Sequence, residues 1–194
     1  PGTTIDLKST SDEAVQVSVS RDDSSVTSKV KKFTDSFNKL VDTIDKFDKF
    51  NKETNEKGVL LGDGTVGRIR QSVYDAVIGA NDELPGQFQT LSQVGITVSD
   101  GAKLSFDEAK FKEALQQDRQ AVEQLFTFEQ TETVGGEEQV TGQSVGKELE
   151  SLLGRLTDSV DGTIQNRIDS IDDRIELNED RMESIDESIQ ARRK

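Results

Sequence analysis

Apolar and polar residues alternate along the first 20 positions of the chain. The apolar members of this pattern are Ile5, Leu7, Val15, Val17 and Val19. A period of two with one apolar face is typical of a half-buried strand. Because two strands alone are marginally stable in water, we expect residues 1–24 to be the terminal strands of a head domain whose other strands precede residue 1.

The period changes at Val26, from where apolar residues recur at alternating steps of four and three. This stripe consists of Val26, Val30, Phe33, Phe37, Leu40, Ile44 and Phe47. The heptad spacing predicts one long helix with capping candidates in 22–25 and an end within 51–58. Because phenylalanine is bulky for the seam of a two-stranded coiled coil, we expect the helix to pack into a wider bundle.

The middle of the chain predicts several short elements. A helical face predicts a helix over about residues 65–80. Alternating apolar residues on both sides of an Asp-Gly turn predict a hairpin near 94–106. Ser105 and Glu108 match the capping-box pattern and predict that a helix begins there. Residues 127–142 are rich in Thr, Glu, Gln and Gly with little to bury, so we expect a mobile loop.

Two further apolar stripes fill the last third of the chain. The first is Leu149, Leu153, Leu156 and Val160, and the second is Ile164, Ile168, Ile171, Ile175, Met182, Ile185 and Ile189. Asn178 interrupts the second stripe at a seam position, where a polar residue costs stability but fixes register. The spacing stutters between the stripes beside Gly162, which predicts one kinked helix or two helices in series.

The long stripes supply the candidate packing or interface residues. These are Val30, Phe33, Phe37, Leu40, Ile44, Phe47, Ile164, Ile168, Ile171, Ile175, Met182, Ile185 and Ile189. As a hypothesis, the stripe over 30–44 packs against the C-terminal helices in an antiparallel arrangement. The narrower stripe over 164–189 has densely charged flanks. It serves either the bundle core, or a partner chain or residues of the parent protein that are missing from this sequence. The predicted class is α+β, with a helical leg domain over residues 25–194.

Composition narrows the function classes. The chain has no His and no Cys, so catalytic triads, cysteine nucleophiles, disulfides and ordinary zinc or haem sites are excluded. Its 24 Lys and Arg against 38 Asp and Glu give a formal charge of −14, which opposes nucleic-acid binding. Hydrophobic residues make up 31%, and no run approaches the roughly 18 apolar residues of a membrane span.

Three patterns could carry chemistry, and each has a simpler interpretation. Residues 62–67 match G-x-G-x-x-G, but no β-α-β unit surrounds them, so a glycine-rich turn before a helix is favoured. Residues 100–108 resemble half of a calcium loop, yet Ile96 and Val98 would occupy ligand positions. Paired carboxylates such as Asp172 with Asp173 are expected on solvated helix faces. We therefore predict no catalytic, cofactor or metal site.

The order of motifs resembles the C-terminal region of a known family. The motifs are the strand residues 15–19, the helix over 30–40, Leu60-Leu61-Gly62-Asp63, Leu91 to Thr97 followed by Asp100-Gly101, Leu104 to Lys110, Val122 to Phe126, and the C-terminal heptads. Together they resemble the bacterial flagellar filament cap family FliD, also called flagellar hook-associated proteins. Gly64 and Gly67 depart from the small or polar residues that the family tends to have there.

The resemblance implies a non-enzymatic assembly factor that is secreted through the flagellar export apparatus to the filament tip. It also implies an oligomer of the full-length protein, with flagellin, hook-filament junction proteins and an export chaperone as partners, and with no cofactor. In some members it implies a contribution to adhesion.

Two alternatives remain at this point. One is a free-standing coiled-coil adhesin or interaction module, and the other is a nucleotide-dependent enzyme using residues 62–67, which needs a parallel sheet.

Overall fold

The structure is a computed structural model that describes residues 6, 22–51, 53, 55–79 and 84–193. Its helices are α1 (Ser24–Asp48), α2 (Gly64–Ile78), η1 (Leu91–Val94), η2 (Asp100–Ala102), α3 (Glu108–Gln117), α4 (Arg119–Thr127), α5 (Val145–Thr157) and α6 (Thr163–Arg193). Its antiparallel strand pairs are β1 (Phe50–Asn51) with β2 (Glu56–Lys57), β3 (Ile96–Ser99) with β4 (Lys103–Phe106), and β5 (Glu129–Val134) with β6 (Glu137–Gln143). The predicted α+β class is confirmed.

The strands expected before residue 20 lie outside the described residues. The proposed division into a head segment over 1–24 and a leg over 25–194 therefore stays a prediction. The long helix predicted from the first heptad stripe is α1, and the two C-terminal stripes form α5 and α6 in series, separated by residues 158–162.

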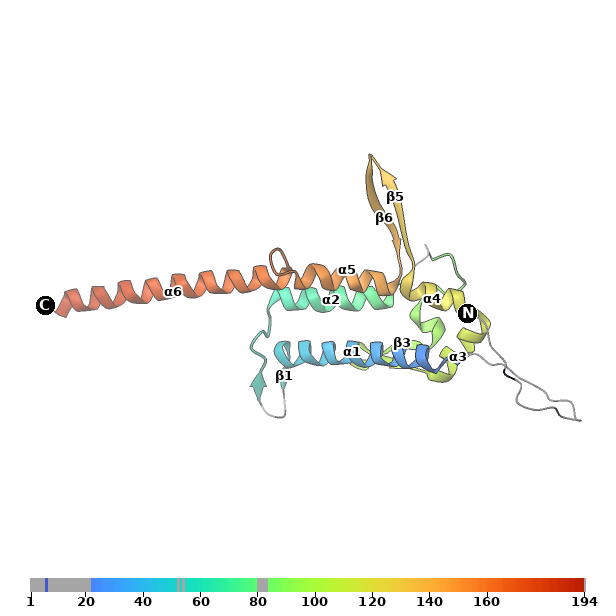
Figure 1. Ribbon diagram of the computed structural model, residues 1–194. Coiled ribbons are helices and arrows are strands. Elements are labelled where there is room, and N and C mark those ends of the chain that lie inside the picture. The colour runs from blue at the N-terminus through green and yellow to red at the C-terminus, as the bar shows by residue number, and fades with distance from the viewer. Residues whose placement is uncertain (1–5, 7–21, 52, 54, 80–83, 194) are drawn as a thin grey trace, which may run out of the picture.

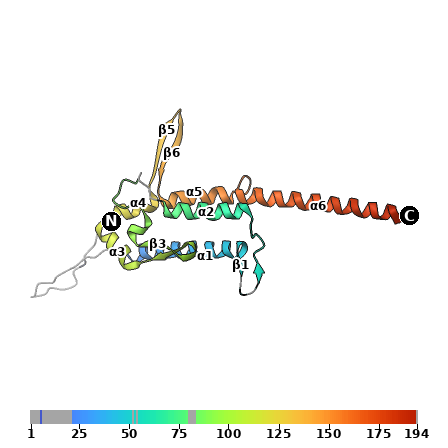
Figure 2. The same cartoon turned by 180° about the vertical axis from the view of Figure 1, so that it is seen from behind.

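Three helices lie side by side along the body of the molecule, with α2 next to both α1 and α5 (Figure 1). The same arrangement seen from behind shows α6 continuing far beyond the body from the end of α5 (Figure 2). α2 runs opposite to both neighbours, so α1 and α5 run in the same direction. The hypothesis of an antiparallel packing between α1 and the C-terminal helices is wrong in this respect. α2 is the next helix along the chain and folds back on α1 after the connection over 49–63, which contains β1 and β2, so it takes the antiparallel position.

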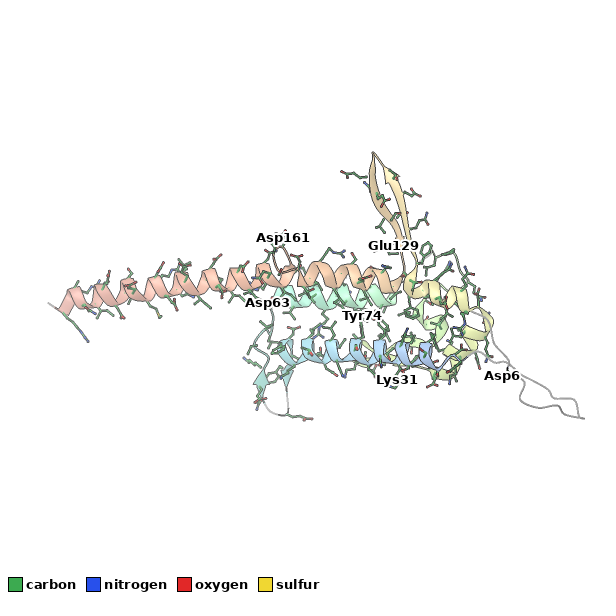
Figure 3. The ribbon with its side chains drawn as sticks, viewed as in Figure 1. Asp6, Lys31, Asp63, Tyr74, Glu129 and Asp161 are labelled. Atoms are coloured by element: carbon green, nitrogen blue, oxygen red, sulfur yellow. The ribbon has the colours of Figure 1, made fainter. Side chains whose placement is uncertain are left out.

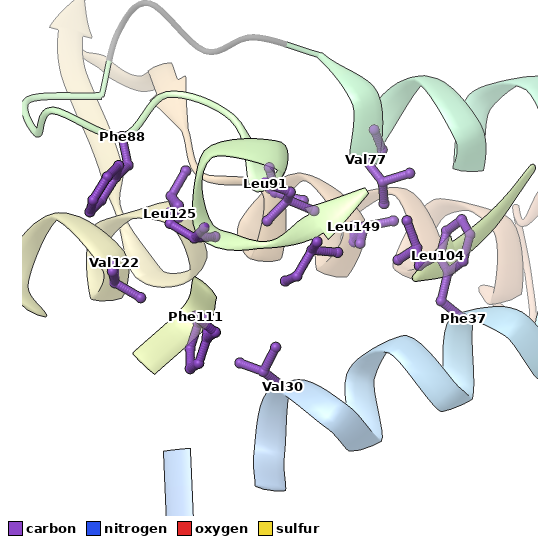
Figure 4. Close-up of a cluster of buried hydrophobic side chains, with 14 of the residues drawn as sticks. Val30, Phe37, Val77, Phe88, Leu91, Leu104, Phe111, Val122, Leu125 and Leu149 are labelled. Atoms are coloured by element: carbon purple, nitrogen blue, oxygen red, sulfur yellow. The ribbon is translucent and has the colours of Figure 1, made fainter. Parts of the chain in front are cut away.

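The core lies where α3, α4, η1 and the β3–β4 hairpin meet the three long helices (Figure 4). Phe111 of α3, Leu125 of α4 and Val94 of η1 are fully buried there. Phe111 also packs edge-to-face on Phe106, with ring centroids 5.4 Å apart. Because these anchors come from three short elements, burying apolar surface stabilises all of them together.

The hairpin expected near 94–106 is formed by β3 and β4 and docks on α1. The Asn38 side chain makes both contacts of a backbone-like pairing: Nδ2 donates to the Leu104 carbonyl at 2.9 Å, and Oδ1 accepts from the Leu104 N–H at 2.7 Å. The capping box predicted at Ser105 is wrong. Ser105 pairs with Thr97 in the strand ladder, so the N-cap shifts to Asp107, which accepts from the Lys110 N–H at 3.0 Å.

The loop expected over residues 127–142 is also wrong, because β5 and β6 form an antiparallel hairpin that projects from the body (Figure 1). Gly135 and Gly136 make its turn with positive φ values of 67° and 94°, which glycine adopts without strain. Most of the hairpin's described side chains are exposed. The backbone ladder and turn geometry therefore define it, with little apolar burial.

Candidate interaction surface

The α1 stripe divides between the core and two grooves. Val30 and Phe37 are buried, and Phe33 and Leu40 are partly buried against the core. Val30 and Phe33 line a groove of about 680 Å³ together with Phe126 of α4 and Leu149 of α5. The half of α1 nearer its N-terminus thus belongs to the bundle core, as expected for an intramolecular helix stripe.

A tight turn joins α5 to α6. The Asp158 side chain accepts the Val160 and Asp161 N–H groups at 2.8 and 2.9 Å, and these bonds hold the pKa of Asp158 below its ordinary value. A Cβ on Gly162 would lie 2.2 Å from the Asp158 carbonyl oxygen. Glycine is therefore required at 162 for the chain to turn this closely before α6 begins.

An ion pair fixes the root of α6 on the N-terminus of α2. Arg167 donates from Nε and Nη2 to Asp63 Oδ2 at 3.0 and 2.5 Å, and the Asp63 side chain is only 9% exposed. Asp63 is at the same time the N-cap of α2, accepting from the Thr65 N–H at 2.7 Å. The cap bond and the guanidinium together lower the pKa of Asp63. Figure 3 shows Asp63 at the end of the body where α6 departs.

An apolar groove of about 460 Å³ runs beside this ion pair. Its apolar lining comes from three helices and the turn before α2: Leu40, Ile44, Phe47, Leu60, Val66, Ile69, Ile164, Ile168 and Ile171. The structure thus brings the second half of the α1 stripe together with the start of the α6 stripe. Phe47, Ile164 and Ile168 are nevertheless 38%, 42% and 46% exposed, so the groove is open to solvent.

Beyond the groove, α6 has no neighbour among the described residues. Ile175, Met182, Ile185 and Ile189 lie on one helix face at heptad spacing and are 45% to 63% exposed. Every described residue from 172 to 193 is exposed, and α6 extends away from the body in both views (Figures 1 and 2). A helix face with this apolar spacing is suited to pack on another helix, so we take it, with the groove at its root, as the candidate interaction surface.

The glycine-rich segment and the acidic residues considered above as possible chemical sites have a structural explanation or no arranged site among the described residues. Residues 58–63 form turns and Gly64 begins α2, and the sheets of the described residues are all two-stranded and antiparallel. No group of three or more acidic side chains in that part of the chain is placed to hold a metal ion. None of the described helices has the length and apolarity to cross a bilayer.

The packed helical body and the long helix with an exposed apolar face define a helix-rich α+β protein with a helical interaction surface. Within that class, the chain belongs to the family described as flagellar hook-associated protein 2 C-terminus, which matches residues 1–194. This confirms the resemblance predicted from the motifs.

Individual relatives agree with the family assignment. The chain is 25% identical to flagellar hook-associated protein 2 of Helicobacter pylori strain J99 over 156 residues, covering 80% of this chain and 22% of that protein. It is 26% identical to the A-type flagellar hook-associated protein 2 of Pseudomonas aeruginosa over 198 residues, covering 97% and 37%. The chain therefore spans well under half the length of these relatives.

A solved structure has a similar fold. The crystal structure of the flagellar cap protein FliD D1-D2-D3 domains from Escherichia coli matches with a TM-score of 0.60 at 24% identity. The match covers 78% of this chain and 37% of that one.

Two features of the structure were not predicted from the sequence. The ion pair between Asp63 and Arg167 joins residues 104 positions apart, and only the N-cap signal of Asp63 before α2 is visible locally. The β5–β6 hairpin had one signal, the pair Gly135 and Gly136.

Proposed function

We propose that this chain is the C-terminal part of a structural assembly factor of the bacterial flagellum. In this function the full-length protein forms the filament cap, retains exported flagellin at the distal tip and promotes its polymerisation. It works outside the cell, after export through the flagellar apparatus, and it catalyses no reaction. Its partners are further copies of itself, flagellin, the hook-filament junction proteins and an export chaperone.

The observation that carries the proposal is the family match over the whole chain. It is supported by relatives named flagellar hook-associated protein 2 and by a similar fold in a protein described as the flagellar cap protein FliD. The geometry is compatible with this role. A long helix with an exposed apolar face gives a cap subunit a surface for contacts with neighbouring subunits.

A deletion of the parent gene tests the function. Without a cap, exported flagellin is expected to accumulate as monomer in the medium, and purified full-length protein added from outside is expected to restore filaments. Normal filaments in the deletion strain contradict the cap role, and they leave a coiled-coil adhesin or interaction module as the function to pursue.

Two matched variants of the full-length protein test the part played by α6. Ile175 and Leu177 are equally exposed, at 50% each, but only Ile175 lies on the heptad face. Ile175→Asp is expected to lose the rescue of filaments, because a carboxylate in an apolar helix contact is costly. Leu177→Asp is expected to retain it. Equal rescue by both variants would mean that the heptad face of α6 has no part in capping.

A further inference from the structure

A short loop interrupts two helices that otherwise lie in line. Residues 158–162 join α5 to α6 and loop out to one side, while α6 continues in the direction of α5 in both views (Figures 1 and 2). The loop closes on itself, because a Cβ on Gly162 would lie 2.2 Å from the Asp158 carbonyl oxygen and 2.7 Å from the Asp158 nitrogen. The loop residues therefore add little to the length of the α5–α6 axis.

The hydrophobic pattern does not require this interruption. A continuous helix over 145–193 would place the apolar residues of both C-terminal stripes within an arc of about 120°, at 3.6 residues per turn. These residues are Leu149, Leu153, Leu156, Val160, Ile164, Ile168, Ile171, Ile175, Met182, Ile185 and Ile189. An arc of this width is an ordinary apolar face of one helix. The stutter beside Gly162 thus widens the stripe without breaking it.

The loop leaves Val160 without the burial that the stripe would give it. Val160 is 72% exposed, whereas Leu156, one helical turn earlier, is 7% exposed and belongs to the core. In a continuous helix Val160 would follow Leu156 on the face that packs on the body. Removal of its side chain from water and new helical hydrogen bonds would both favour this arrangement.

Local polar contacts favour the loop instead. The Asp158 side chain accepts the Val160 and Asp161 N–H groups at 2.8 and 2.9 Å, and Asn166 Nδ2 donates to the Asp161 carbonyl at 3.1 Å. The loop also consists of Asp, Ser, Val, Asp and Gly, which all rank below Ala, Leu, Lys and Glu as helix formers. Two arrangements of the same segment therefore compete.

We infer that residues 158–162 are a conformational switch with two states: the loop described above, and a helical segment that joins α5 and α6 into one continuous helix. In a helix Asp158 and Gly162 are about 6 Å apart along the axis. Uptake of the loop therefore moves α6 outward by roughly 4–6 Å. The body and α6 both stay folded, so the molecule lengthens by a change of register and not by bending.

The ion pair at the root of α6 belongs to the looped state. Arg167 donates to Asp63 at 2.5 Å, and an ion pair needs an N···O distance of about 4 Å or less. Moving α6 outward separates the guanidinium from the carboxylate, so this pair opposes uptake of the loop. Arg167→Ala should therefore increase the population of the continuous helix. This inference does not rest on the proposed flagellar function.

Two variants select the two states. Asp158→Ala with Gly162→Ala removes the acceptor of the loop bonds, places a Cβ where the loop has no room and favours a helix. This double alanine variant is expected to form the continuous helix. Ser159→Pro is expected to keep the loop, because proline breaks a helix interior. Proline also requires an extended residue before it, and Asp158 has φ −55° and ψ 133°.

NMR Cα chemical shifts of residues 158–162 report the state directly. Helical shifts are expected in the double alanine variant, and loop shifts in Ser159→Pro. Asp161→Ala with Gly154→Ala is the matched control, because it makes the same two chemical changes nearby. Only backbone atoms of Asp161 take part in the loop's hydrogen bonds, and a Cβ on Gly154 would meet nothing within 4 Å. The control is expected to keep the loop.

The wild type is expected to exchange between the two states on the microsecond-to-millisecond timescale. Relaxation dispersion should detect a minor state at residues 158–162 whose shifts match those of the double alanine variant. Ser159→Pro should abolish this exchange. The absence of a minor state in the wild type, or loop shifts in the double alanine variant, overturns the inference.

Spin labels measure the displacement, and the chain has no native cysteine to interfere. Lys39→Cys on α1 and Glu176→Cys on α6 place the labels at exposed positions. The distance between them is expected to be roughly 4–6 Å longer in the double alanine variant than in Ser159→Pro. Equal distances in the two variants would overturn the proposed change of register.

Discussion

Two alanine substitutions in α5 should change stability in opposite directions. A Cβ on Gly146 would lie 2.2 Å from the carbonyl oxygen of Phe126 in α4, which is backbone and cannot move aside alone. A Cβ on Gly154 would meet nothing within 4 Å, and this position is exposed. The same chemical change in the same helix therefore isolates the close approach of α5 to α4.

The magnitudes follow from overpacking and helix propensity. Overpacking costs about 1–3 kcal/mol, and Gly146→Ala belongs at the upper end because the obstacle is a main-chain atom. Gly154→Ala should stabilise the chain by about 0.8–1 kcal/mol, the difference between glycine and alanine in a helix interior. The two variants should thus differ by about 3–4 kcal/mol in free energy of unfolding, or roughly 6–16 °C in melting temperature.

Tyr74 provides the assay. It is the only tyrosine, the chain has no tryptophan, and it lies half-buried on α2 beside Phe37. Its fluorescence therefore reports the unfolding of the body alone. Circular dichroism would also include the signal of the projecting helix α6. Urea titrations of both variants measure the difference. Equal midpoints for Gly146→Ala and the wild type would refute the close packing of α5 on α4.

Three further predictions concern the core and the root of α6. Phe37→Ala should cost about 3–5 kcal/mol of stability, and Phe37→Asp should unfold the body; an unchanged melting temperature for the latter contradicts the burial of Phe37. Asn38→Asp loses the donor to the Leu104 carbonyl and should cost about 1–3 kcal/mol, measured by urea titration against wild type. Because the pKa of Asp63 is lowered in the folded state, its ionised form stabilises the fold above its unfolded pKa. This contribution is lost as the pH falls below about 4. The difference in melting temperature between wild type and Asp63→Asn should therefore shrink from pH 6 to pH 2, and a difference constant with pH would exclude this linkage.

The long helices and the small hairpin could be predicted because their signals are local. Heptad spacing over 26–47 and 164–189 is a property of one segment, and the turn at Asp100 and Gly101 sets the strands on either side of it. The β5–β6 hairpin could not be found from hydrophobic pattern, because it buries almost nothing. Only the pair Gly135 and Gly136 indicated it.

Contacts between segments that are distant in the sequence could not be predicted in this way. Arg167 is one of several arginines on α6, and nothing near it in the sequence indicates that its partner is Asp63. The direction of α5 relative to α1 was likewise beyond the pattern, since apolar stripes define which face is buried and not which helix covers it. The apolar stripes of α1 and α6 were visible in the sequence, but Leu60, Val66 and Ile69 of the groove were not among the predicted residues. The division of the candidate surface into a groove at the root and an exposed outer face likewise required the structure.

A small change of angle at the root of α6 produces a large displacement at its far end. From Arg167 to Arg193 the helix rises about 39 Å at 1.5 Å per residue. A tilt of about 10° at Arg167 would move the far end by about 7 Å, more than one helical turn. The direction of the helix thus depends on the contacts at its base: the ion pair of Asp63 with Arg167, the turn at Asp158 and the apolar groove. A substitution at this base would therefore displace the far end of α6 without changing any residue there.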